Sequence, residues 1–115
     1  MKKIFRTRDS NIYLKDILQS IRKIEKYTKG LTLAKYKKDS LIKDAVLRNL
    51  GVIREAARHI LPSVKKDIHD IDWQKIIGLR NILIHEYFGV DEEIIWDIAV
   101  KQASTVKQAL TSHLK

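Results

Sequence analysis

Several residue types are scarce in this chain of 115 residues: it has no cysteine, one proline and four glycines. The absence of cysteine excludes disulfides, thiolate metal sites and a cysteine nucleophile, and it fits a reducing compartment. No apolar run approaches the ~20 residues of a transmembrane helix, and residues 1–10 have no apolar core of a signal peptide. We therefore expect a cytoplasmic protein that does not span a membrane.

Positive charge is abundant but uneven. The net charge is +9, and residues 1–38 carry all of it, with 12 Lys/Arg against 3 Asp/Glu. Two groups of these cations, at the start of the chain and near position 36, could form a surface that attracts phosphates: Lys2, Lys3, Arg6, Arg8, Lys35, Lys37 and Lys38. The alternative is a solvated helix face that only aids solubility.

The spacing of apolar residues is helical throughout, and no segment has a β pattern. Long helices are predicted from Asp9 or Ser10 to Gly30, from Asp39 to about Ile60, from Asp72 to Gly89, and from Asp91 onward. Short helical turns are expected at 32–38 and after Pro62. The sequence thus predicts one all-α domain over residues 1–115, an up-and-down bundle of four long helices plus one or two short ones.

The segment 78–89, GLRNILIHEYFG, places polar groups on what should be the most buried helix. On a continuous helix, Arg80 and Tyr87 fall inside the apolar stripe, while Asn81 and His85 lie four residues apart on its flank. The absent side chain of Gly78 would let another backbone or a substrate come close. Burying an unpaired guanidinium is costly, so Arg80 needs a carboxylate, an anion or a second subunit.

Two readings of these four residues remain open. One is a core ion pair beside a packed histidine; the other is a reactive site in which Asp44 or Glu55 of the second helix orients Arg80 or His85. A metal site is not expected, because His85 is the only histidine of the group and no HExxH pattern is present.

RNA cleavage suits the four side chains, because a 2′-hydroxyl can be the nucleophile while the protein moves protons and stabilises charge. His85 would be general acid or base, and Arg80 would pair with the phosphate oxygens. Asn81 would hold the imidazole or the substrate, and Tyr87 would donate to the leaving oxygen or a phosphate. A two-fold dimer would supply a second histidine.

The spacing from Arg80 to Tyr87 resembles the R-x4-H-x-Y signature of the HEPN superfamily, and Asn81 fits the R-N-x-x-x-H-x-Y form of its HepT-like (DUF86) branch. The resemblance extends over roughly residues 9–112, through DAVLRNLGVIREAARHILP and IDWQKIIGLRNILIHEYFGVDEEIIWDIA. It implies a HEPN-like helical homodimer with the motifs at a cleft between subunits. It also implies a metal-independent ribonuclease toxin that uses no cofactor, with Arg80 and His85 catalytic and Asn81 supporting them.

The same resemblance implies a partner, an MNT-type minimal nucleotidyltransferase antitoxin that transfers AMP to Tyr87. It also favours RNA as the ligand of the basic residues named above. Two other hypotheses remain: a non-catalytic subunit that presents a substrate or nucleotide to a nucleotidyltransferase, and a basic helical adaptor with Arg80 in a core salt bridge.

Overall fold

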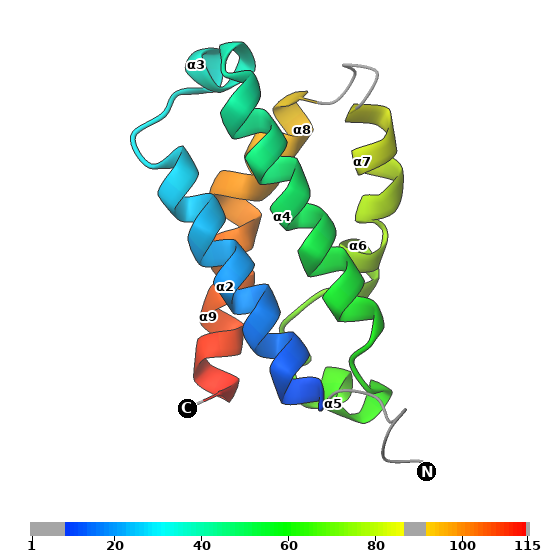
Figure 1. Ribbon diagram of the computed structural model, residues 1–115. Coiled ribbons are helices and arrows are strands. Elements are labelled where there is room, and N and C mark those ends of the chain that lie inside the picture. The colour runs from blue at the N-terminus through cyan, green and yellow to red at the C-terminus, as the bar shows by residue number, and fades with distance from the viewer. Residues whose placement is uncertain (1–8, 87–91, 115) are drawn as a thin grey trace.

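The computed structural model describes residues 9–86 and 92–114, except the side chains of His85 and Glu86. The described residues form helices joined by short connections, with no strand among them (Figure 1). The prediction of an all-α bundle is confirmed. Within the same two ranges, no helix is long and apolar enough to cross a membrane.

Two antiparallel helices of equal length, α2 (Ser10–Thr28) and α4 (Ser40–Arg58), form the largest helix-to-helix contact of the molecule (Figure 1). Each presents a stripe of fully or almost fully buried apolar side chains to the other elements of the bundle. These stripes are the centre of the core and include Leu14, Ile17, Ile21 and Ile24 of α2, and Val46, Leu50, Ile53 and Ala57 of α4.

The helix boundaries in the first half of the chain follow the predicted capping residues. The Asp9 carboxylate accepts a hydrogen bond from the Asn11 backbone N–H at 2.8 Å, and the Asp39 carboxylate accepts one from Ile42 at 3.0 Å. Gly30 ends α2 with φ of +75°. The two short helices are also confirmed, α3 (Leu33–Lys38) with Tyr36 buried, and α5 (Pro62–Asp67) with proline in its first turn.

The prediction of one continuous helix after Asp72 is wrong, because the chain breaks at Gly78. Helix α6 (Trp73–Ile77) ends there, and α7 (Leu79–Glu86) begins with the next residue. A Cβ atom on Gly78 would lie 3.2 Å from the carbonyl oxygen of Gln74. Among the described residues, the nearest atoms that an added Cβ would meet are thus the carbonyl oxygens of its own preceding turn.

The last helix is also less regular than predicted. Helix α8 (Glu92–Asp97) and α9 (Ala103–His113) are joined by one π-helical turn, η1 (Ile98–Gln102). The Gln102 amide donates a 2.9 Å hydrogen bond to the carboxylate of Asp97, five residues earlier. This hydrogen bond, with the charge of Lys101, lowers the pKa of Asp97 below its ordinary value.

The bundle places the end of α7 close to two other elements. Helix α4 descends from α3 toward α5, and α7 ascends beside its upper half (Figure 1). The C-terminal end of α7, the start of α8 and all of α3 therefore lie at one end of the molecule, and α5 lies at the other.

Candidate functional site

Helix α7 packs on α4 through Leu79, which is 5% exposed, and through the half-buried Ile82 and Leu83. Arg80 and Asn81 are exposed on its other side. The prediction that Arg80 lies inside the apolar stripe is therefore wrong for the single chain. Two physical reasons account for the difference: the break at Gly78 separates α7 from α6, and an unpaired guanidinium favours water over the core.

The Arg80 guanidinium forms no ion pair with any residue that the structure describes. The core salt bridge considered from the sequence is absent from the described ranges. An exposed guanidinium without a carboxylate partner keeps its five N–H donors available for an anion such as a phosphate.

The structure therefore brings Arg80 and Asn81 together on the exposed side of the first turn of α7. The backbone N–H of Asn81 donates a 3.3 Å hydrogen bond to the carbonyl oxygen of Gly78. This bond links the first turn of α7 to the residue at the break. His85 is in the last turn of α7. Its side chain and the whole of Tyr87 lie outside the described part of the chain.

The two carboxylates suggested as supporting groups lie at opposite ends of α4. Asp44 is exposed in the half of α4 that lies toward α3. Glu55 is near the other end, and its carboxylate pairs with Arg58 and His59, each at 3.0 Å, and with Arg54 at 3.5 Å. The hydrogen bonds from His59 and Arg58 lower the pKa of Glu55. The carboxylate of Glu55 thus has partners other than Arg80.

Of the predicted basic surface, the structure describes the part on α3. Lys35, Lys37 and Lys38 are all exposed, at the same end of the molecule as the C-terminal end of α7 (Figure 1). Lys37 forms an ion pair with Glu93 of α8 at 3.1 Å. The four other predicted cations, Lys2, Lys3, Arg6 and Arg8, lie outside the described residues.

Contacts that sequence reasoning missed hold the start of α8 in place. Lys43 of α4 pairs with Glu92 at 2.9 Å, and both side chains are only about a quarter exposed, at 26% and 24%. The rings of Tyr36 and Trp96 pack with their centroids 5.1 Å apart. These pairs join residues some 50 to 60 positions apart, so no local pattern could have indicated them.

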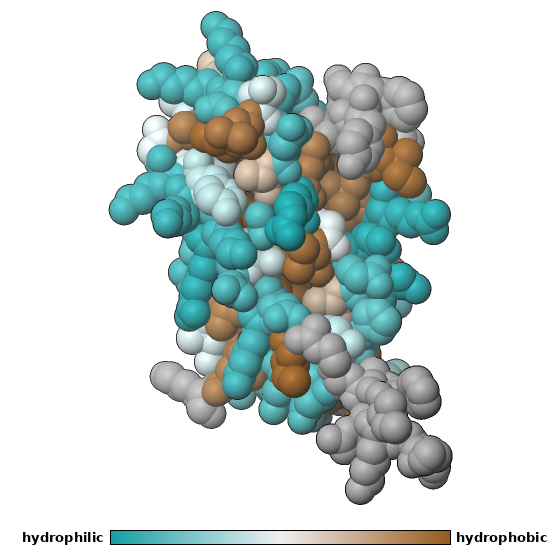
Figure 2. All heavy atoms as spheres, in the orientation of Figure 1, coloured by the Kyte–Doolittle hydropathy of each residue, from teal (hydrophilic) through white to brown (hydrophobic). Residues whose placement is uncertain are grey.

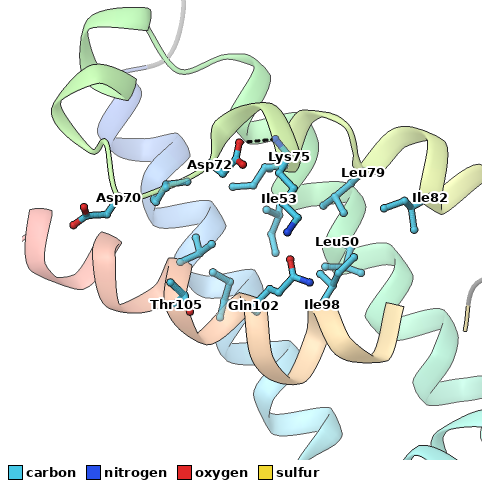
Figure 3. Close-up of a pocket in the computed structure, with 15 residues that line it drawn as sticks. Leu50, Ile53, Asp70, Asp72, Lys75, Leu79, Ile82, Ile98, Gln102 and Thr105 are labelled. Carbon is cyan, nitrogen blue, oxygen red and sulfur yellow. Dashed lines mark hydrogen bonds between the residues drawn. The ribbon is translucent and has the colours of Figure 1, made fainter. Parts of the chain in front are cut away.

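A cleft of ≈ 270 Å³ opens between the α6–α7 segment and the η1–α9 segment (Figure 3). Its walls are mainly aliphatic and include Leu79 and Ile82 of α7, with Asp72, Lys75 and Gln102 among its few polar groups. Neither Arg80 nor Asn81, the two motif residues whose side chains the structure describes, is among its lining residues. In the described ranges, no three histidine or acidic side chains converge as metal ligands would.

The fold and this site together define a class of protein: a small helical bundle in which helix α7 exposes Arg80 and Asn81 and carries His85 five and four residues after them. The model of the HepT-like family, described as "Ribonuclease HepT-like", matches residues 17–112. The chain belongs to this family. No solved structure matches it.

Similar proteins carry names of the same kind. The chain is 35% identical over 101 residues to "Putative RNase MJ1380" of Methanocaldococcus jannaschii, covering 88% of this chain and 93% of that protein. It is 33% identical over 95 residues to "Probable ribonuclease HepT" of Thermococcus cleftensis, covering 83% and 86%. These alignments extend over most of the length of both partners, so the similarity concerns the whole domain.

Proposed function

We propose that this protein is a metal-independent endoribonuclease toxin of a toxin–antitoxin module. Arg80, Asn81, His85 and Tyr87 would form its active site. The observation that carries the proposal is the exposure of Arg80 without an ion-pair partner among the described residues. Membership of a ribonuclease family and the names of the relatives support RNA as the substrate.

The chemistry follows from these residue types. His85 would take the proton of a 2′-hydroxyl, whose oxygen then attacks the adjacent phosphorus and displaces the 5′-oxygen of the next nucleotide. The bond to that oxygen breaks, the oxygen takes a proton from a second acid, either Tyr87 or the histidine of a second subunit, and the products are a 2′,3′-cyclic phosphate and a 5′-hydroxyl. Arg80 would stabilise the extra negative charge on the phosphate oxygens in the transition state.

A dimer would provide the second acid–base group that one histidine lacks. Apolar side chains reach the surface over α7 (Figure 2), and Ile84 on this helix is 44% exposed. Ile94 of α8 is 48% exposed. Exposed aliphatic side chains next to a candidate site favour an interface, and a two-fold axis through it would bring two copies of α7 together.

Inhibition would act on Tyr87. We propose that an MNT-type nucleotidyltransferase transfers AMP from ATP to the Tyr87 phenol oxygen and releases pyrophosphate. The product carries a bulky anionic phosphodiester seven residues from Arg80 in sequence. Such a group would compete for the phosphate-binding guanidinium and repel RNA.

Cleavage of a mixture of transfer RNAs in the presence of EDTA tests this function. The wild-type protein is expected to yield 2′,3′-cyclic phosphate ends, and His85→Ala is expected to yield none while remaining folded. If unmodified wild-type protein cleaves no RNA but binds a nucleotidyltransferase, the non-catalytic subunit replaces the nuclease. The mass of the purified chain shows whether Tyr87 is unmodified.

A further inference from the structure

A group of rings and guanidinium groups lies at the end of the molecule opposite the C-terminal end of α7 (Figure 1). We call it the α2–α4 end cluster, and it consists of Tyr13, Arg54, Glu55, Arg58 and His59. The Tyr13 and His59 rings stack with their centroids 5.3 Å apart and their planes 18° from parallel.

The α2–α4 end cluster is preorganised by one carboxylate. Oxygen Oε1 of Glu55 accepts a hydrogen bond from Arg58, and Oε2 pairs with His59 Nε2, each at 3.0 Å. Arg54 approaches the same carboxylate at 3.5 Å. The carboxylate of Glu55 thus contacts two guanidinium groups and the His59 ring, and within the cluster two arginines stand against one acidic residue.

Stability alone is a weak reason for this arrangement. The side chains of Arg58 and His59 are 51% and 44% exposed, and ion pairs this exposed stabilise a helix only slightly. A partly exposed ring pair with guanidinium groups beside it is, however, what single-stranded RNA needs. Bases stack on the rings, and guanidinium groups bind the phosphates.

We propose that the α2–α4 end cluster is a second RNA-binding site, which contacts substrate RNA at a distance from α7. This inference rests on the proposed function. The molecule is 49 Å long, and the cluster and the C-terminal end of α7 lie toward opposite ends. Only RNA long enough to span both places benefits from the second site, so the preferred substrate is an extended RNA.

Fluorescence anisotropy with two labelled single-stranded RNAs, of about 30 and about 6 nucleotides, tests this inference. The protein carries His85→Ala, so that no RNA is cleaved. The double variant Arg54→Gln/Arg58→Gln is compared with Lys66→Gln/Lys101→Gln, which removes the same charge from two exposed positions outside the cluster.

We expect Arg54→Gln/Arg58→Gln to raise the Kd for the long RNA about tenfold and to make that Kd less dependent on salt concentration. The Kd of the control variant for the same RNA should stay within about twofold of the parent value. The Kd for the short RNA should not respond. His59→Ala should weaken binding of the long RNA, and His59→Phe, which keeps a ring, should restore it. Thermal unfolding establishes that each variant is folded.

The second site would be overturned if the two double variants change the Kd for the long RNA equally, or if neither changes it. It would also be overturned if the parent protein does not bind the long RNA. Cleavage assays separate this failure from failure of the proposed function. If wild type cleaves RNA and Arg54→Gln/Arg58→Gln cleaves long RNA equally well, only the second site is wrong. If RNA binding depends on the cluster but wild type cleaves nothing, only the nuclease is wrong.

Discussion

Lys43 of α4 and Glu92 of α8 form an ion pair of 2.9 Å whose two side chains are about three-quarters buried. The adjacent pair, Lys37 and Glu93, has a similar length but is 40% and 72% exposed. Because solvent screens the second pair more, its contribution to stability should be smaller.

Double-mutant cycles on these two ion pairs give the first prediction. With Lys43→Met and Glu92→Gln, we expect a coupling energy of about 1 kcal/mol in the free energy of unfolding. The cycle with Lys37→Met and Glu93→Gln should give about 0.3 kcal/mol or less. Urea unfolding measures both, and equal coupling energies would show that burial does not distinguish the pairs.

The second prediction contrasts two glycines. A Cβ atom on Gly78 would lie 3.2 Å from a backbone oxygen, whereas one on Gly51, within α4, would meet nothing within 4 Å. Gly78→Ala should therefore destabilise the protein by about 1 kcal/mol, and Gly51→Ala should stabilise it by about 0.5–1 kcal/mol. Urea unfolding should give opposite signs, and a stabilising Gly78→Ala would contradict the tight junction between α6 and α7.

The third prediction concerns pH and Glu55. Its pKa is lowered in the folded protein by His59 and Arg58, so its contribution to stability is present above the unfolded-state pKa. That contribution is lost as the pH falls through the lowered folded-state pKa. Glu55→Gln should therefore lower Tm at about pH 7, and the difference from wild type should shrink in acid.

Asp67→Asn is the control for Glu55→Gln, because Asp67 is exposed and has no ion pair with a described residue. Its Tm difference from wild type should be small at every pH. A Glu55→Gln difference that is constant with pH would mean that Arg54, Arg58 and His59 do not stabilise the fold through the charge of Glu55.

The fourth prediction concerns the proposed dimer. Ile84 of α7 and Ile12 of α2 are almost equally exposed, at 44% and 42%, so replacing either by glutamate should change monomer stability by less than about 0.5 kcal/mol. Only Ile84→Glu should convert the dimer to a monomer. Light scattering at micromolar concentration checks this, and a monomeric wild type or a dimeric Ile84→Glu would contradict the interface over α7.

The helices were predictable because their signals are local. Asp9, Asp39 and Pro62 mark helix starts through capping and backbone geometry, and the apolar spacing predicted the buried faces of α2 and α4. The break at Gly78 was not predictable from the spacing of apolar residues, because a single glycine is often tolerated within a helix. The π turn at η1 has no sequence signal that we recognise.

The family was predictable from the sequence, but the placement of Arg80 on α7 was not. The spacing of Arg80, Asn81 and His85 indicated the family, and the match to the HepT-like ribonuclease model confirms it. The predicted position of Arg80 around the helix axis was wrong because the prediction assumed a helix without the break at Gly78. The pairing of Glu92 with Lys43 depends on tertiary packing, which periodicity does not encode. The partners of Glu55 are local, one, three and four residues away along the chain.

The central claim is tested most directly by measuring both RNA cleavage and thermal unfolding of the Arg80→Ala variant. The control is Lys75→Ala, which replaces an exposed cation on α6. Because Arg80 is exposed and has no ion pair with a described residue, we predict that Arg80→Ala folds like wild type and loses cleavage by at least about a hundredfold. Lys75→Ala should fold and cleave normally. An Arg80→Ala protein that unfolds, or one that is folded and cleaves RNA at the wild-type rate, would contradict the central claim.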